Sequence, residues 1–151
     1  MTAKLPHLQV AIGVVERHGR YLVGRRRKPS HLAGYWEFPG GKRHPGESWQ
    51  ACLRRELLEE VNIAVRIVRR LAPLVYRYPS HSVRMEVFRC RQVAGRPKPL
   101  GCAAVRWVTL AELRSLRFPP ANQPLVRRLL RLHPRRRRGI IVKDRQRRDH
   151  A

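Results

Sequence analysis

Residues 41–63 read GKRHPGESWQACLRRELLEEVNI and hold the strongest structural signal in the chain. Pro45 and Gly46 mark a turn, and Ser48 then stands at the N-cap position of a helical pattern that runs to Val61. Asn62 follows as a C-cap, because Asn tolerates positive φ better than most residues. The stretch therefore predicts a turn, a helix and a left-handed stop.

The predicted helix collects acids in a chain that has few of them. The protein has 34 Lys and Arg but only 10 Asp and Glu, and Glu47, Glu56, Glu59 and Glu60 all fall within this stretch. Residues three and four apart share a helix face, so the last three point the same way. The opposite face is expected to be apolar and buried, and it carries Ala51, Leu57, Leu58 and Val61.

Three aligned carboxylates repel one another by a few tenths of a kcal/mol per pair unless something compensates. Arg54 and Arg55 could neutralise them on an ordinary solvated surface. The alternative is Mg²⁺, a hard cation that takes carboxylate oxygens together with water and substrate phosphates. The acids alone leave both interpretations open.

The spacing around the acids resembles the Nudix box. Gly41, five residues, Glu47, seven residues and then residues 55–63 (RELLEEVNI) match every fixed position except Asn62, where the family has Gly. The resemblance implies a Nudix hydrolase that uses Mg²⁺ or Mn²⁺. It implies that the Gly40 carbonyl and three acids hold the metal, while Arg55 and Glu47 stabilise the loop–helix–loop. The implied acids are Glu56, Glu59 and Glu60.

The flanking segments predict an α+β fold. A hairpin is expected from the runs 8–15 and 21–23 around His18-Gly19, and a short strand from Tyr35 to Phe38 is stopped by the Pro39-Gly40-Gly41 breakers. Further strands are expected at 63–68, 71–78, 83–90 and 103–108, and helices at 111–116 and 123–132. The resemblance implies the Nudix fold, an α/β/α sandwich with a mixed, curved β-sheet.

Three more segments are similar to the MutT type of Nudix hydrolase, the 8-oxo-dGTP diphosphatases. They are Trp36–Lys42 (WEFPGGK), Phe118–Asn122 (FPPAN) and Arg25-Arg26, and the likeness runs from about Leu8 to Leu132. It implies hydrolysis of 8-oxo-dGTP or a related nucleoside triphosphate to monophosphate and pyrophosphate. Such an activity sanitises the nucleotide pool and belongs to DNA repair.

The same resemblance suggests a base pocket. Asn122 would hydrogen-bond the oxidised guanine, since an amide both donates and accepts; the competing role is N-cap of the helix at 123–132. Phe38 would stack on the base or belong to the core. Arg26 is a candidate phosphate or base contact, and His81 is a candidate to replace the charged residues that the family has in the turn 79–82.

One departure from the family concerns the proton acceptor. MutT-type enzymes carry an acid in the loop before the strand that contains Trp107, whereas residues 97–104 contain no Asp or Glu and Gly101 occupies the nearest position. The acceptor would then be Glu56, another acid of the box, or hydroxide held by the metal.

The formal net charge of +24 makes polyanions expected partners, whether nucleotides or nucleic acids. From Pro134 onward eight basic and two acidic residues give +6, so +18 lies before the tail. We expect a Nudix domain at 1–133 and a disordered basic tail at 134–151.

Residues 1–6 (MTAKLP) have no apolar signal core, no run approaches the roughly 18 apolar residues of a membrane span, and the three cysteines form no close pair. A cytoplasmic monomer or homodimer without membrane contact is expected. The competing functions are an RNA 5′-pyrophosphohydrolase, a dinucleoside polyphosphatase, and a nucleic-acid-binding protein on an inactive Nudix fold.

Overall fold

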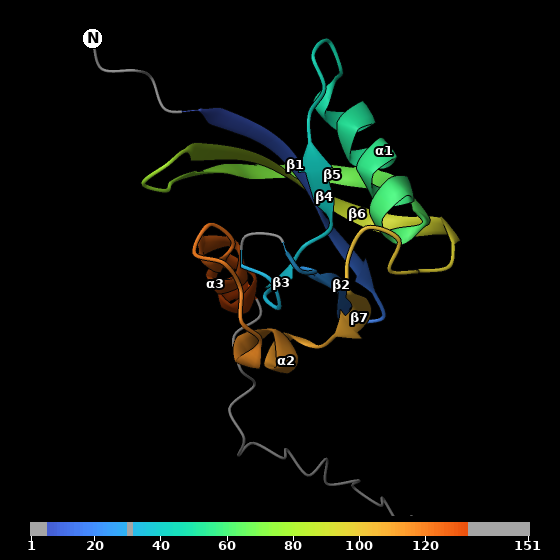
Figure 1. Cartoon of the computed structure of the whole chain (residues 1–151). Helices are drawn as coiled ribbons and strands as arrows, with labels where there is room; N and C mark the ends of the chain where they lie inside the picture. The colour runs from blue at the N-terminus through green and yellow to red at the C-terminus, as the bar shows by residue number, and fades with distance from the viewer. Residues whose placement is uncertain (1–5, 30–31, 133–151) are drawn as a thin grey trace, which may run out of the picture.

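The computed structural model describes residues 6–29 and 32–132 (Figure 1). They form one mixed β-sheet with helices on both of its faces. The strands are β1 (His7–Arg17), β2 (Arg20–Arg25), β3 (Trp36–Glu37), β4 (Gly40–Lys42), β5 (Ile63–Arg77), β6 (Ser82–Gly95) and β7 (Ala104–Val108). The helices are α1 (Trp49–Val61), α2 (Leu110–Ser115) and α3 (Gln123–Leu132).

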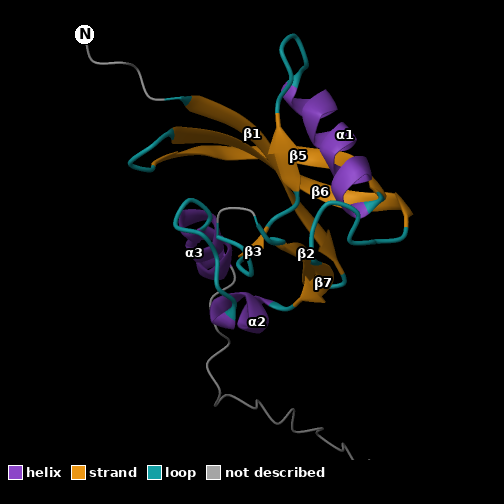
Figure 2. Ribbon diagram, viewed as in Figure 1, coloured by secondary structure: helices purple, strands orange, loops and turns teal. Residues whose placement is uncertain are grey.

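The seven-stranded sheet runs in the order β3-β2-β1-β6-β5, with β4 also paired to β1 and β7 to β2. The pair β1–β6 is parallel and the other pairs are antiparallel, which makes the sheet mixed. Helix α1 lies on one side of this sheet, and α2 and α3 lie on the other (Figure 2). The predicted α+β fold and α/β/α layering are confirmed.

Alternation along β1 divides the core into two parts. Ala11 and Val15 pack with the buried side chains of α1, whereas Ile12 and Val14 pack with those of α2 and α3. Successive side chains of a strand point to opposite faces, so one buried strand serves both layers.

Both predicted caps of α1 are present. The Ser48 hydroxyl accepts the N–H of Ala51 at 3.1 Å. Asn62 is left-handed, with φ 62° and ψ 35°, and its N–H bonds to carbonyls of the last helical turn. The Asn62 side chain also donates to the Arg96 carbonyl at 3.0 Å, which ties the helix end to the loop after β6.

The predicted apolar face of α1 was partly wrong. Ala51 and Leu58 are exposed, and the residues buried in this helix are Cys52, Leu53, Leu57 and Val61. The buried face is centred on a row spaced by four residues, Leu53–Leu57–Val61, and Leu58 lies about 100° away from Leu57 around the helix.

Two strand predictions were also wrong. The segments 63–68 and 71–78 belong to one strand, β5, whose register shifts between Ile67 and Arg69 and between Leu71 and Leu74. Pro73 is tolerated within it because β5 is an edge strand. The Gly40-Gly41 breaker is itself part of β4, which pairs with Val10–Ile12.

The close approach of β4 to β1 explains why Gly40 and Gly41 lie in a strand instead of ending one. A Cβ atom on Gly40 would collide with the Ala11 carbonyl, so only glycine permits this pairing. The predicted basic tail at 134–151 lies outside the described residues. Among the described helices, none has the length and apolar character to cross a membrane.

Replacing Asn62 tests the helix stop. A left-handed conformation costs a residue with a Cβ about 1–2 kcal/mol. Asn62→Ala and Asn62→Gly both lose the hydrogen bond to Arg96, so the difference between the two variants measures the cap conformation. We expect Asn62→Ala to lower the free energy of unfolding by about 1–2 kcal/mol in urea titrations, whereas Asn62→Gly stays within about 0.5 kcal/mol of the wild type. An alanine variant as stable as the wild type would show that the cap conformation does not limit stability.

Candidate active site

The acidic face of α1 opens into a cavity of about 330 Å³. Helix α1 contributes the three acids, β4 contributes Gly40, and the loop after β6 contributes Gly101. The lining residues are Gly40, Glu56, Glu59, Glu60 and Gly101. The structure thus brings together the predicted metal-holding residues, and we call this space the acid cavity.

Arg55 organises the acids around this cavity. Its guanidinium donates to both carboxylate oxygens of Glu47, at 2.7 and 2.9 Å, and to the Lys42 carbonyl at 3.0 Å. The same group donates to Glu56 at 2.8 Å and to Glu59 at 3.1 Å. The hydrogen bonds from Arg55 lower the pKa of Glu47 to about 2, so this carboxylate is ionised at neutral pH.

Glu60 has the most perturbed carboxyl group of the site. Its Oε2 accepts the N–H of Gly40 at 3.1 Å. Burial and, secondly, the nearby negative charge of Glu37 raise the pKa of Glu60 to about 8, against the stabilising Gly40 N–H. A carboxyl group whose pKa is strongly perturbed by burial and by a neighbouring charge is typical of functional sites.

The donor set of the acid cavity fits a hard divalent cation, because carboxylate and carbonyl oxygens are the ligands that Mg²⁺ takes, with water completing its shell. Among the described residues, however, no three His, Cys, Asp or Glu side chains are arranged so that they could hold a metal ion together. Arg55 holds Glu56 and Glu59, and the Gly40 N–H holds Glu60. To hold a cation jointly, these side chains would have to leave the hydrogen bonds that they make here.

A second cavity, of about 270 Å³, adjoins the acid cavity. All four predicted substrate-binding residues line it, namely Arg26, Phe38, His81 and Asn122. Gly40 lines both cavities. We call this second space the base pocket; its remaining walls come mainly from β1, β4, β6 and the segment before α3.

Asn122 does not cap α3 with its side chain. The backbone carbonyl of Asn122 accepts the N–H groups of Leu125 and Val126, at 3.1 and 3.2 Å, as an N-cap residue does. Its side-chain oxygen is buried and has no hydrogen-bond partner among the described residues. A buried, unpartnered amide oxygen is costly unless a ligand or water satisfies it.

Phe38 belongs to the core as well as to the pocket wall. Its side chain is buried and its ring stacks on Phe118, with centroids 5.4 Å apart. His81 stacks on Tyr78 at 4.8 Å and exchanges a 2.8 Å hydrogen bond with Ser80. The turn after β5 therefore offers the pocket a histidine side chain and no Asp, Glu, Lys or Arg.

Glu37 and Tyr78 line the base pocket but were not among the predicted site residues. Glu37 forms a 2.7 Å ion pair with Arg26, and burial raises the pKa of its carboxyl group although Arg26 opposes the rise. Glu37 could have been predicted, because acids are rare in this chain and Glu37 lies in the segment that resembles MutT-type enzymes. Nothing in the local sequence marks Tyr78.

The acid-free loop before β7 closes the end of α1. The N–H groups of Leu100 and Gly101 donate to the Glu60 carbonyl, at 3.0 and 2.9 Å, and that of Lys98 donates to Val61 at 3.0 Å. Gly101 packs against Glu60, where an added Cβ would lie 3.2 Å from its Cγ. The loop holds the acidic helix through its backbone and adds no carboxylate.

Comparisons with known proteins agree with this geometry. The family model described as NUDIX domain matches residues 10–128. The 8-oxo-dGTP diphosphatase of Escherichia coli K12 is 32% identical over 83% of this chain and 98% of its own length. The CTP pyrophosphohydrolase of the same organism is 28% identical over 85% of this chain and 96% of its own.

Solved structures show the same fold. The solution structure of the E. coli ORF135 protein has a TM-score of 0.76 at 27% identity, covering 89% of this chain and 96% of that one. The crystal structure of the MutT protein from Methanosarcina mazei Go1 has a TM-score of 0.77 at 24% identity, covering 87% and 98%. The chain belongs to the NUDIX domain family. Within that family it is a MutT-type Nudix hydrolase.

The raised pKa of Glu60 predicts a pH dependence of stability. Folding raises this pKa from 4.5 to about 8, so the folded state holds a proton that the unfolded state has lost. The stabilisation is complete below pH 4.5 and disappears as the pH rises to about 8. Because Glu60 is only half-buried, solvent screening reduces the effect to about 1–2 kcal/mol.

Thermal unfolding in EDTA at pH 5.5 and 8 measures this contribution. The wild type should lose several degrees of Tm between the two values, and Glu60→Gln should lose less because glutamine does not titrate. Identical pH dependence of Tm in the two proteins would mean that Glu60 is not protonated in the folded state.

Proposed function

We propose that the protein hydrolyses nucleoside triphosphates to the monophosphate and pyrophosphate, with 8-oxo-dGTP as the substrate that its base pocket fits. One observation carries the proposal: Gly40 lines both the acid cavity and the base pocket. A nucleotide whose base occupies the pocket can therefore extend its phosphates past Gly40 to the acids. The relative named 8-oxo-dGTP diphosphatase supports the substrate class.

The phosphate end of the substrate needs cations, because a triphosphate and three carboxylates repel each other. We infer that Glu56, Glu59 and Glu60, with the Gly40 carbonyl, hold Mg²⁺ or Mn²⁺. Such an ion, when bound, polarises the phosphoryl group and lowers the pKa of a water molecule. Arg55 fixes Glu47 by two hydrogen bonds and so keeps the loop before α1 in place.

Because residues 97–104 supply no acid, we propose that the proton of the attacking water goes to Glu56 or another acid of the box, or that the metal holds hydroxide. Burial raises the pKa of Glu60 to about 8, so this carboxyl group must lose its own proton before it can hold a cation or accept another proton at neutral pH. Glu56 lines the same cavity and is the first candidate. The loop that carries Gly101 contributes only to the position of these acids.

The base end of the substrate is recognised by polar groups in an otherwise largely apolar pocket. We propose that Asn122 hydrogen-bonds the purine edge with its unpartnered oxygen, and that Phe38 forms part of the wall against which the base lies. Arg26, oriented by Glu37, and His81 are proposed to contact the base or the sugar. Lys42 also lines the pocket.

A second substrate class is supported by a specific feature. The turn that carries His81 has no Asp, Glu, Lys or Arg, and a similar protein is named CTP pyrophosphohydrolase. Release of pyrophosphate from 8-oxo-dGTP, dGTP, CTP, a diadenosine polyphosphate and 5′-triphosphorylated RNA tests the choice. The highest kcat/KM should be for 8-oxo-dGTP; a higher value for CTP or RNA would reassign the substrate.

Three further properties are proposed on the sequence. Residues 1–133 form the hydrolase domain and residues 134–151 a basic tail that makes no part of the pocket. The three cysteines, all free and buried, suit a reducing cytoplasm. A monomer or homodimer is proposed for the oligomeric state.

Removing one acid of the cavity tests the metal assignment. Glu59→Gln and Glu60→Gln should each lower kcat by orders of magnitude in Mg²⁺, because the metal loses a charged ligand. Glu112→Gln, an acid on α2 outside both cavities, is the control and should keep near-normal turnover. Near-normal kcat in both cavity variants, with their folds intact by circular dichroism, would refute the assignment.

Asn122→Ala separates recognition of the base from capping of the helix. If Asn122 recognises the purine, loss of the hydrogen bond costs about 1–3 kcal/mol, which reduces the preference for 8-oxo-dGTP over dGTP by roughly tenfold to a hundredfold in kcat/KM. The free energy of unfolding should hardly change, since the side-chain oxygen bonds to nothing in the fold. Lower stability by about 1 kcal/mol with an unaltered ratio would instead establish a cap.

A further inference from the structure

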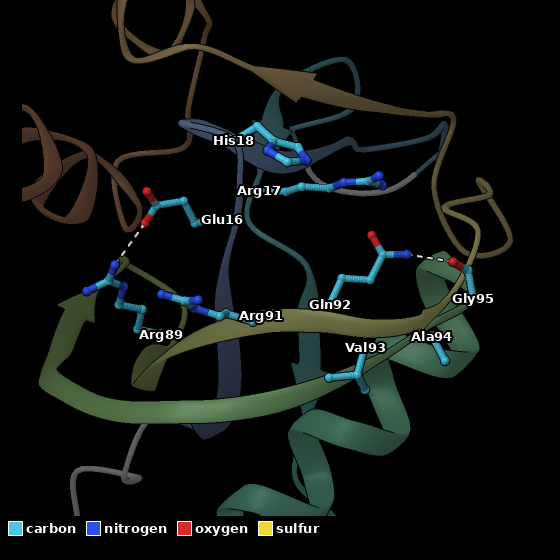
Figure 3. A pocket seen from close by; sticks show the side chains of 9 residues that line it. All are labelled: Glu16, Arg17, His18, Arg89, Arg91, Gln92, Val93, Ala94 and Gly95. Carbon is cyan, nitrogen blue, oxygen red and sulfur yellow. Dashed lines mark hydrogen bonds and ion pairs between the residues drawn. The ribbon is translucent and has the colours of Figure 1, made fainter.

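A third cavity, of about 560 Å³, is larger than the other two and shares no lining residue with them. The β1–β2 turn forms one of its sides and the end of β6 the other (Figure 3). Ile12 of β1 lines the base pocket and Glu16 lines this cavity, so along the strand they lie about 13 Å apart. The cavity is therefore a separate feature of the same sheet.

Positive charge dominates this cavity. Its lining includes Arg17, Arg89 and Arg91 but one acid, Glu16, which pairs with Arg89 at 3.3 Å. In Figure 3, Arg17 and Arg91 approach the hollow from its two sides. Within the described part of the chain, neither of their guanidinium groups has a hydrogen-bond or ion-pair partner.

Strand β5 extends the charge beyond the cavity. Arg66 lies directly opposite Arg91, and Arg69 directly opposite Arg89, in the β5–β6 register. Opposed residues of an antiparallel pair share a face, and like charges in such pairs are destabilising. Arg66 and Arg69 are exposed and find no acid among the described residues. The fold thus gathers five arginines here, and among the described residues only Arg89 is paired with an acid.

The shape of this surface favours an extended polyanion. Alternate residues on one strand are about 6.6 Å apart and neighbouring strands about 4.8 Å apart, so the arginines span more than one phosphate group. No Phe, Tyr or Trp lines the cavity. Proteins that bind bases without sequence preference use such rings for stacking, and their absence from this lining leaves the phosphates as the groups to be contacted.

We propose that the cavity, together with Arg66 and Arg69, binds the sugar–phosphate backbone of nucleic acid without reading its sequence. We call this surface the arginine groove; its charged members are Arg17, Arg66, Arg69, Arg89 and Arg91. A hydrogen bond of 2.6 Å from the Gln92 side chain to the Gly95 carbonyl braces the strand end beneath it. Nucleic acid held there leaves the acid cavity and the base pocket open to nucleotides.

The test is fluorescence anisotropy of a short labelled DNA duplex with the full-length protein over a range of NaCl concentrations. The Arg66→Ala/Arg91→Ala variant should bind roughly tenfold more weakly, and the slope of log K against log salt should fall by about 0.9 for each phosphate that the variant no longer neutralises. The control is Arg114→Ala/Arg127→Ala, which removes two exposed arginines from the surface of α2 and α3. The control should bind as the wild type does.

Three results would overturn the proposal: no binding by the wild type, no weakening in the groove variant, or an equal weakening in the two variants. Equal weakening would indicate that the DNA is attracted by the positive charge of the whole surface and not by the groove. Inorganic phosphate at matched ionic strength distinguishes the source of the ligand. If phosphate displaces DNA no better than chloride does, the result supports a site for the nucleic-acid backbone. If phosphate displaces DNA better than chloride does, the groove is a site for free phosphate. Unchanged dGTP hydrolysis confirms that both variants are folded.

Discussion

Two adjacent glycines allow β4 to lie between β1 and α1, and the geometry of the whole site depends on that contact. A Cβ on Gly40 would collide with the Ala11 carbonyl, and one on Gly41 would collide with the Glu56 carboxylate. Because neither residue has a side chain, the backbone of β4 reaches the acids directly. The Gly40 N–H then holds Glu60, and Gly40 joins the acid cavity to the base pocket.

The chemistry of the site depends on the charges around the contact of β4 with β1 and α1. The chain carries a formal +24, yet its acids are concentrated beside β4, where burial and mutual repulsion raise the pKa of Glu60. Arg55 restrains the cluster by bonding three of its carboxylates. A cluster so arranged is costly without a cation, and the surrounding positive charge attracts anionic substrates to it. These charges support the proposal that the site holds a metal ion and phosphate together.

The sequence predicted α1 most fully, because its signals are local. The Ser48 cap, the Asn62 stop and the alignment of Glu56, Glu59 and Glu60 depend on neighbours along the chain, and the structure has all three. Its errors arose where tertiary contacts decide. Leu58 is exposed because α1 packs on the sheet through the neighbouring row that contains Leu57. Strand β5 is continuous because Pro73 falls at a register shift, between Leu71 and Leu74.

Pocket residues contributed by distant segments were predicted only by resemblance. Arg26, Phe38, His81 and Asn122 come from four separate parts of the chain, and no periodicity relates them. The side-chain oxygen of Asn122 illustrates the limit: a residue before a helix is an expected N-cap, and only the packed structure shows that its side chain caps nothing. Tyr78 was missed for the same reason.

The position of bond cleavage tests most directly whether one nucleotide spans both cavities. With the base in its pocket and the acids beyond Gly40, water should attack the β-phosphorus. Hydrolysis of dGTP in ¹⁸O-labelled water, followed by mass spectrometry of the products, locates the attack. The account predicts ¹⁸O in pyrophosphate and unlabelled dGMP. Label in dGMP, or orthophosphate as the first product, would contradict it.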